Sequence, residues 1–122
     1  MKFEEALKRA AEKWFTLFKL NRYGYFEWRT STTSTMDCWS AKNPNAITQD
    51  DLDEILAMIG HYYEIITVPP DEELHLPEPC WAYIAHKRDP YCNCIHGWPP
   101  GFKTKLEAAK SAFIAVIERE TK

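Results

Sequence analysis

Residues 80–117 read CWAYIAHKRDPYCNCIHGWPPGFKTKLEAAKSAFIAVI, a stretch that combines two strand patterns with one helix pattern. Strands are predicted over 80–87 and 91–98, joined through the turn sequence Arg88-Asp89-Pro90. The run Trp98-Pro99-Pro100-Gly101 is expected to end the second strand, because proline cannot donate a ladder hydrogen bond. A short connection of this kind makes the two strands antiparallel.

The helix that follows is defined by its start and by its apolar face. Thr104 and Glu107 have the spacing of a capping box, in which each side chain accepts a hydrogen bond from a backbone N–H of the first turn. The apolar residues recur at helical spacing: Leu106, Ala109, Ala112, Phe113, Val116 and Ile117.

Two helices and three strands are predicted before residue 80. The helices cover about 3–21 and 48–60, the second opened by Thr48 and Asp51 and closed by Gly60. The strands are stretches rich in aromatic and β-branched residues: 22–30, 36–41 and 62–68. The polar run 30–35 and the acidic, proline-marked run 71–79 are expected as loops.

These elements predict the α+β class, with the order α-β-β-α-β-β-β-α. Hairpins rather than crossovers join most strands, so helices are expected to pack on one antiparallel sheet of about five strands. The 122 residues are predicted to form a single domain, 1–122.

The charge is strongly segregated along the chain. Residues 43–86 contain no Lys or Arg, and the rest of the chain sums to +6, so the overall −3 hides the division. A one-signed surface repels nucleic acid and attracts basic partners. The nine carboxylates predicted to bind such a partner are Asp50, Asp51, Asp53, Glu54, Glu64, Asp71, Glu72, Glu73 and Glu78. The first four are also what a helix N-terminus prefers for its own stability.

The cysteines lie at 38, 80, 92 and 94, and export is not expected, because the first residues lack a continuous apolar run, so disulfides are disfavoured. A zinc site would draw on a set of thiols and imidazoles: Cys80, His86, Cys92, Cys94 and His96. A five-residue hairpin loop would place His86 opposite Cys92, which favours such a cluster, whereas a four-residue loop would place it opposite Asn93. Paired CxxC knuckles are absent, so buried structural thiols are favoured and no metal or other cofactor is predicted.

A catalytic cysteine paired with His96 or His61 is the lesser alternative, because a nucleophilic thiol needs a neighbour that lowers its pKa. The sequence contains no hydrolase elbow, P-loop or dinucleotide-binding fingerprint. The protein is therefore predicted not to be an enzyme.

The aromatic residues leave a second alternative open. Tyr23, Tyr25 and Arg29 share a parity on the predicted strand and could stack a base or a nucleotide, helped by Lys87 and Arg88. Strands packed under helices use the same residue types, so a core role is favoured over a ligand pocket.

The C-terminal third resembles a known family. Trp81-Ala82-Tyr83-Ile84, a second strand ending near Gly101, and Thr104 opening an Ala-rich helix are similar to the phage ABA-sandwich domains over about forty residues. The chain lacks the proline that usually follows the helix-starting threonine in that family. The resemblance implies a phage origin and an α/β sandwich, and it carries no catalytic residues.

The predicted function is that of a non-enzymatic interaction protein of phage or mobile-element origin. Its acidic surface would bind and inhibit a basic host protein that handles nucleic acid or acts in defence. An aromatic and arginine-lined nucleotide pocket is the alternative, and a zinc-stabilised module is the second alternative. No apolar run reaches the ~20 residues that a membrane span needs, so a cytoplasmic location is expected, without direct nucleic-acid binding. Five Trp and six Tyr would also suit a homo-oligomer interface.

Overall fold

A computed structural model of the chain describes residues 1–32, 37–73, 75, 78–87 and 94–121. The chain divides into two compact units. Unit 1 comprises Met1–Ile47 with Ile117–Lys122, and unit 2 comprises Thr48–Val116. A single domain over 1–122 stays a prediction.

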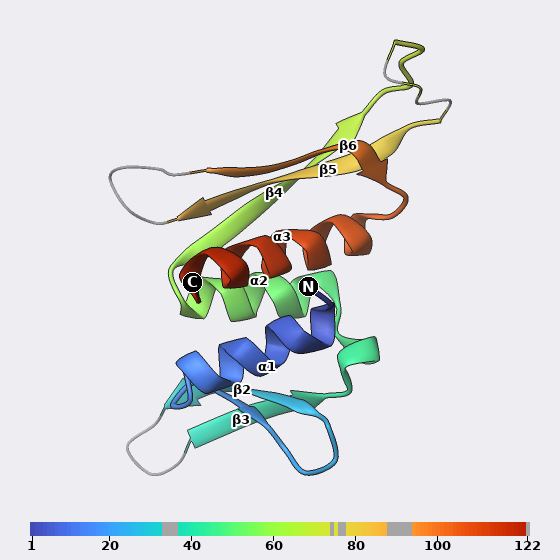
Figure 1. Ribbon diagram of the computed structural model, residues 1–122. Helices are drawn as coiled ribbons and strands as arrows, with labels where there is room; N and C mark the ends of the chain where they lie inside the picture. The colour runs from blue at the N-terminus through green and yellow to red at the C-terminus, as the bar shows by residue number, and fades with distance from the viewer. Residues whose placement is uncertain (33–36, 74, 76–77, 88–93, 122) are drawn as a thin grey trace. The chain divides into compact units, whose positions relative to one another are not determined.

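Unit 1 is built from a helix on a three-stranded antiparallel sheet of order β1-β2-β3. Figure 1 shows α1 along one face of this sheet. The buried side chains of this unit include Leu7 of α1 and three sheet residues, Phe18, Phe26 and Trp28. The elements are α1 (Phe3–Lys13), β1 (Phe18–Leu20), β2 (Phe26–Thr32), β3 (Asp37–Lys42) and the 3₁₀ turn η1 (Pro44–Ala46).

The first helix is shorter than predicted. It ends at Lys13, because the next residue, Trp14, adopts φ −110° and ψ 54°, which lie outside the helical region. The predicted helix 3–21 includes Phe18 on its apolar stripe, but Phe18 pairs with Trp28 across β1 and β2. An apolar residue that suits a helix stripe suits a strand face as well, and here the contact with the sheet prevails.

The strand predicted from residue 22 begins at Phe26, because a turn occupies the preceding residues. Asn21 Oδ1 accepts hydrogen bonds from Tyr23 N (2.9 Å) and Tyr25 N (3.0 Å), and Gly24 has φ +80°. This side-chain turn and a left-handed glycine are incompatible with an extended strand. Phe26 and Trp28, which share the other parity of this stretch, are buried, whereas the core role favoured for Tyr23 and Tyr25 is wrong, since the turn leaves both exposed.

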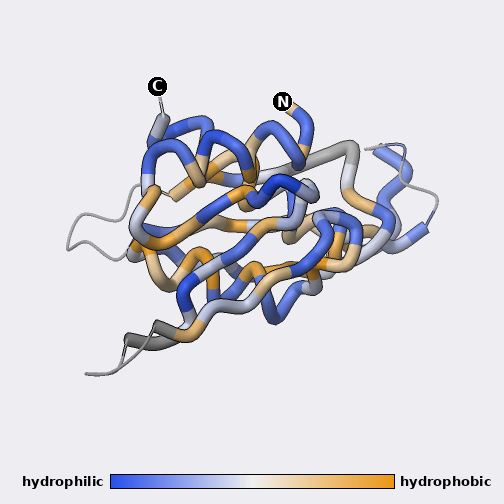
Figure 2. The backbone as a smooth tube through the Cα atoms, turned by 90° about the horizontal axis from the view of Figure 1, so that it is seen from below, coloured by the Kyte–Doolittle hydropathy of each residue, from blue (hydrophilic) through white to orange (hydrophobic). Residues whose placement is uncertain are grey.

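Unit 2 consists of two helices and a second antiparallel sheet of order β4-β5-β6. In Figure 1, α3 lies along one face of this sheet. Figure 2 shows hydrophobic and hydrophilic stretches alternating along the helices, as expected of elements with one buried face. The elements are α2 (Gln49–Met58), β4 (His61–Val68), β5 (Cys80–Lys87), β6 (Ile95–Phe102) and α3 (Lys105–Glu120), whose end from Ile117 belongs to unit 1.

Both predicted helix starts in this part of the chain are confirmed. Thr48 Oγ1 accepts from Asp51 N (3.2 Å), and Asp51 Oδ2 accepts from Thr48 N (2.9 Å), which completes a capping box. Thr104 Oγ1 accepts from Glu107 N (3.1 Å), while Glu107 Oε2 accepts from Lys103 N (3.0 Å). Side chains therefore satisfy N–H groups that have no partner within the helix.

The last strand departs from the prediction. It was expected over 91–98 with a break at Trp98-Pro99-Pro100-Gly101, yet β6 runs through both prolines. β6 is an edge strand, where the N–H that proline lacks leaves no ladder partner unsatisfied. A register shift in β5, between Trp81 and Tyr83, also lies opposite this segment. The predicted turn Arg88-Asp89-Pro90 lies outside the described residues.

The α+β class and the antiparallel pairing are confirmed, and the strand number is about right. Within the described ranges there are six strands in two three-stranded sheets, rather than about five in one. The three-residue β1 is too short to stand out as a strand pattern, and α2 separates β3 from β4 along the chain. Of the predicted loop 30–35, β2 extends to Thr32, and 33–36 fall outside the described residues.

Candidate functional site

Four side chains from three consecutive strands meet on the unit 2 sheet: Tyr62 and Glu64 of β4, His86 of β5, and Cys94 immediately before β6. Cys94 Sγ lies 3.1 Å from His86 Nδ1. On the other side of the imidazole, His86 Nε2 lies 3.4 Å from Glu64 Oε2. The Tyr62 ring stacks on the imidazole, with 4.8 Å between centroids and 17° between planes. We call these four residues the thiol cluster.

Strand alternation and register explain why these residues meet. The odd-numbered residues of β5 face α3: Tyr83 and Ala85 are buried, and Lys105 of α3 lies over the Trp81 ring at 4.9 Å. His86 therefore points to the opposite face. The β4–β5 ladder aligns Tyr62 with His86. In the antiparallel β5–β6 ladder Ala85 pairs with Ile95, so Cys94, which precedes Ile95, lies beside His86, which follows Ala85.

The imidazole lies between a thiol and a carboxylate, and this order has chemical consequences. A carboxylate at Nε2 favours the tautomer that carries its proton there, which leaves the Nδ1 lone pair facing Sγ. Tyr62 restricts rotation of the ring by stacking on it. The His86 side chain is 16% exposed and that of Glu64 62% exposed, while Cys94 is half-buried, so solutes can reach the cluster.

The residues weighed for zinc do not all come together. Cys80 is buried beside Val68 at the other end of β5, six residues and about 20 Å from His86. His96 is exposed and pairs with Ile84 in the ladder. Cys92 lies outside the described residues. Across the ranges that the structure describes, no group of three or more His, Cys, Asp or Glu residues is placed to hold a metal ion.

The observed register matches neither of the two hairpins considered from the sequence, since His86 lies beside Cys94 rather than Cys92 or Asn93. The prediction of buried thiols holds for Cys80, whereas Cys38 is exposed and Cys94 intermediate. Neither Glu64 nor Tyr62 was connected with the thiols. Tyr62 and Glu64 are two residues apart, which predicts that they lie on the same face of a strand. That spacing does not give the register of a hairpin, so it could not place them beside the thiols.

The first group of predicted partner-binding carboxylates lies on α2. Asp50, Asp53 and Glu54 are exposed, while Asp51 forms the capping box. Burial raises the pKa of Tyr63 above its ordinary value, and a hydrogen bond to Asp53 and the charges of Asp53 and Asp50 raise it further. Tyr63 also donates to the Gln49 carbonyl at 3.2 Å. Much of this group therefore serves the local structure of α2 and β4.

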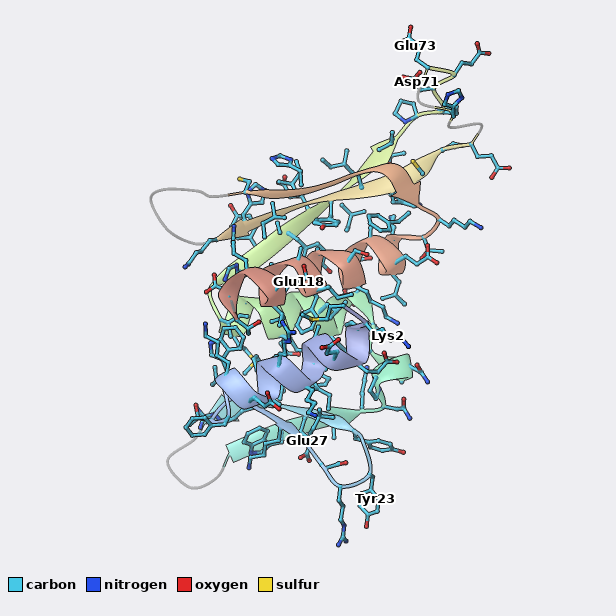
Figure 3. The ribbon with its side chains drawn as sticks, in the orientation of Figure 1. Lys2, Tyr23, Glu27, Asp71, Glu73 and Glu118 are labelled. Carbon is cyan, nitrogen blue, oxygen red and sulfur yellow. The ribbon has the colours of Figure 1, made fainter. Side chains whose placement is uncertain are left out.

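The second group belongs to the connection between β4 and β5 and comprises Asp71, Glu72, Glu73 and Glu78, which we call the acidic tip. Glu72, Glu73 and Glu78 are exposed, and Asp71 Oδ1 accepts a hydrogen bond from Glu73 N (2.9 Å). Figure 3 shows Asp71 and Glu73 beyond the end of the sheet, directed away from it.

The nine carboxylates thus form two separate groups, with Glu64 at the thiol cluster. In Figure 1 the acidic tip and α2 lie at opposite ends of unit 2. The charge nevertheless divides between the units. Unit 2 contains eleven acidic and five basic side chains, a net −6, whereas unit 1 contains seven acidic and ten basic ones, a net +3.

The residues of the predicted nucleotide pocket are distributed over both units. Tyr23 and Tyr25 lie in the β1–β2 turn, 70% and 44% exposed, and Arg22 donates to the Tyr23 hydroxyl (2.8 Å). Arg29 lies on β2, opposite Trp39 of β3. Lys87 lies in unit 2, and Arg88 is outside the described residues.

Three surface hollows of about 370 to 470 Å³ occur in unit 1, and none of them is lined by the predicted pocket residues. The largest is lined by residues of both charges: Arg9, Glu12, Lys13, Glu120 and Thr121. The hollow beside the end of α1 does combine aromatic and cationic side chains, but they are Phe15, Phe18, Lys8 and Lys19 rather than the predicted set.

No protein-family model, curated protein or solved structure matches this chain. The resemblance to the phage ABA-sandwich domains and the phage origin stay predictions. Among the helices of the described residues, none has both the length and the apolar character required to cross a membrane.

Proposed function

We propose that the protein is an interaction module in which unit 2 binds a basic protein surface through the acidic tip. The observation that carries this proposal is the division of charge, with −6 on unit 2 against +3 on unit 1. A one-signed surface accelerates association with a partner of opposite charge and disfavours partners of the same charge.

The acidic tip is the better candidate of the two carboxylate groups. On α2, Asp51 is used in capping, and the early carboxylates complement the positive end of the helix dipole. Glu72, Glu73 and Glu78 are exposed in a connection beyond the ends of two strands, and no helix start uses their charge. The charges of these three carboxylates are therefore accessible to a basic partner.

The partner class is a protein whose basic surface binds nucleic acid. Carboxylates spaced along the tip would occupy positions where phosphates bind, and the domain would act as a competitive inhibitor. Nucleic acid itself is disfavoured as a ligand, because the net −6 of unit 2 repels its phosphates.

Binding of a fluorescent decalysine peptide, followed by anisotropy over a range of salt concentrations, tests the proposal. The tip variant combines Glu72→Gln, Glu73→Gln and Glu78→Gln, and the matched control combines Asp50→Asn, Asp53→Asn and Glu54→Gln, so each removes three charges. Exposed charge pairs contribute about 0.5 kcal/mol each, so the tip variant should weaken binding by about 10-fold at low salt.

The control variant should weaken binding by no more than about 3-fold, through the long-range field alone. Equal losses in the two variants, or an affinity that does not change with salt, would refute the assignment to the tip. Thermal melts of both variants establish that each remains folded.

A further inference from the structure

We propose that Cys94 is a site of reversible thiol modification, which reacts with low-molecular-weight disulfides with His86 as its proton acceptor. The inference goes beyond the proposed interaction function and rests on different residues. Three groups carry it together: the thiol, the imidazole 3.1 Å from it, and the carboxylate 3.4 Å from the far ring nitrogen.

The geometry favours the thiolate, which is the reactive form of cysteine. His86 Nδ1 can take the Cys94 proton, and the resulting imidazolium is stabilised by Glu64 at Nε2. Among the described residues near Cys94, the titratable groups on this face of the sheet are Tyr62 and Glu64 of β4, His86 of β5 and His96 of β6. His86 contacts Sγ through Nδ1.

The cluster also satisfies the requirement of access. His86 and Cys94 are half-buried, in contrast to Cys80, which is buried. A small solute can therefore approach Sγ, while a thiol in the core stays inert.

The exchange step needs no reagent beyond the disulfide itself. The Cys94 proton moves to His86 Nδ1, and the thiolate attacks one sulfur of the disulfide. A new Sγ–S bond forms as the disulfide bond breaks, and the departing thiolate takes the proton back from His86. The products are a mixed disulfide on Cys94 and one free thiol, and a second thiol reverses the reaction.

The test uses the full chain in a Cys92→Ser background, so that the peptide containing Cys94 carries one cysteine. The probe is the neutral bis(2-hydroxyethyl) disulfide, and mass spectrometry of digested protein gives the rate at each cysteine between pH 5.5 and 9.5. Dividing each rate by its value at pH 9.5 removes differences in accessibility. Cys38, which is exposed, is the internal control.

An ordinary thiol with pKa about 8.5 is about 1% ionised at pH 6.5, whereas activated thiols next to an imidazolium titrate roughly 1.5 units lower and are about 25% ionised. The normalised rate at pH 6.5 should therefore be about 20-fold higher for Cys94 than for Cys38. A ratio within 2-fold of unity would overturn the proposal.

Three variants assign the effect to the cluster. His86→Gln should lower the normalised rate at Cys94 to the value at Cys38, and Glu64→Gln should lower it several-fold. His96→Gln, a change of the same kind on the same face, should leave it unaltered. If the His86→Gln variant fails to fold, the Glu64→Gln variant provides the test, because the Glu64 side chain is largely exposed and its replacement should not prevent folding. An unchanged rate in the Glu64→Gln variant, or an equal loss in the His96→Gln variant, would contradict the mechanism.

Discussion

Replacing Gly97 by alanine should destabilise unit 2, because the side chain of Tyr83 occupies the space that a Cβ would need. Tyr83 and Gly97 are direct partners in the β5–β6 ladder. A Cβ built on Gly97 would overlap Cδ1, Cε1 and Cζ of the tyrosine ring. The ring is 8% exposed and packs against Phe102 with 5.9 Å between centroids, so it has little room to move.

The expected loss in the free energy of unfolding is about 3 kcal/mol, the upper part of the range for overpacking, because the overlap involves three atoms of a buried ring. Removal of the ring should abolish this penalty. In a Tyr83→Val background, Gly97→Ala should change the stability by less than about 0.5 kcal/mol, which gives a coupling energy of about 2 to 3 kcal/mol.

Urea denaturation of the four proteins of this cycle, followed by tryptophan fluorescence and circular dichroism, measures the coupling. Gly24→Ala is the control: Gly24 has φ +80° and no atom within 4 Å of its Cβ position, so its loss should not depend on Tyr83. A coupling energy near zero would refute the register. In the register of a five-residue loop Tyr83 would face Ile95, and His86 would no longer lie beside Cys94.

Three further predictions concern the same unit. Thr48→Ala removes the side-chain acceptor for Asp51 N and should lower the unfolding free energy by about 1 kcal/mol in urea denaturation, whereas an unchanged value would contradict the cap. Because burial raises its pKa, Tyr63 should ionise at a higher pH than a free tyrosine in an absorbance titration. Its contribution to stability is complete below pH about 10 and is lost as the pH rises further, because the unfolded chain then releases the proton first; Tyr63→Phe should remove an ionisation from the alkaline end of the titration curve, and an unaltered alkaline end would disprove the assignment. Gly101→Ala places a Cβ against Cys80 Sγ and should shift the melting temperature down by several degrees, and a Cys80→Ala background should recover part of the loss, since Cys80 Cβ and the Trp81 carbonyl stay in place; no recovery at all would show that the Sγ contact is absent.

The fold was largely predictable where local chemistry specifies an element. Thr48 with Asp51, and Thr104 with Glu107, identify helix starts through the hydrogen bonds they make, and these bonds are present. β5 was predicted at its observed bounds, Cys80–Lys87, because its side chains suit a buried strand.

Prediction was poorer where two local patterns compete. The stretch 14–20 satisfies helical spacing, yet the pairing of Phe18 with Trp28 places it in the sheet. Tyr23 and Tyr25 alternate like a strand, but Asn21 and Gly24 form a turn there. Such choices depend on contacts distant in sequence, which a local pattern does not contain.

The candidate site was the least predictable part. Strand alternation gave the parity of Glu64 and His86, but their approach to Cys94 depends on the length of the β5–β6 connection. Clustering of the carboxylates depends likewise on where their elements lie. The charge segregation and its division between a helix start and an acidic loop were visible in the sequence, whereas the positions of these two groups at opposite ends of unit 2 required the structure (Figure 1).

The most direct test of the charge-based account is a map of backbone amide shifts in ¹H–¹⁵N correlation spectra as decalysine is added at low salt. The account predicts that the largest shifts fall at Glu72, Glu73 and Glu78 and disappear as salt is raised. Shifts concentrated on α2, or spread evenly over the two units, would contradict it.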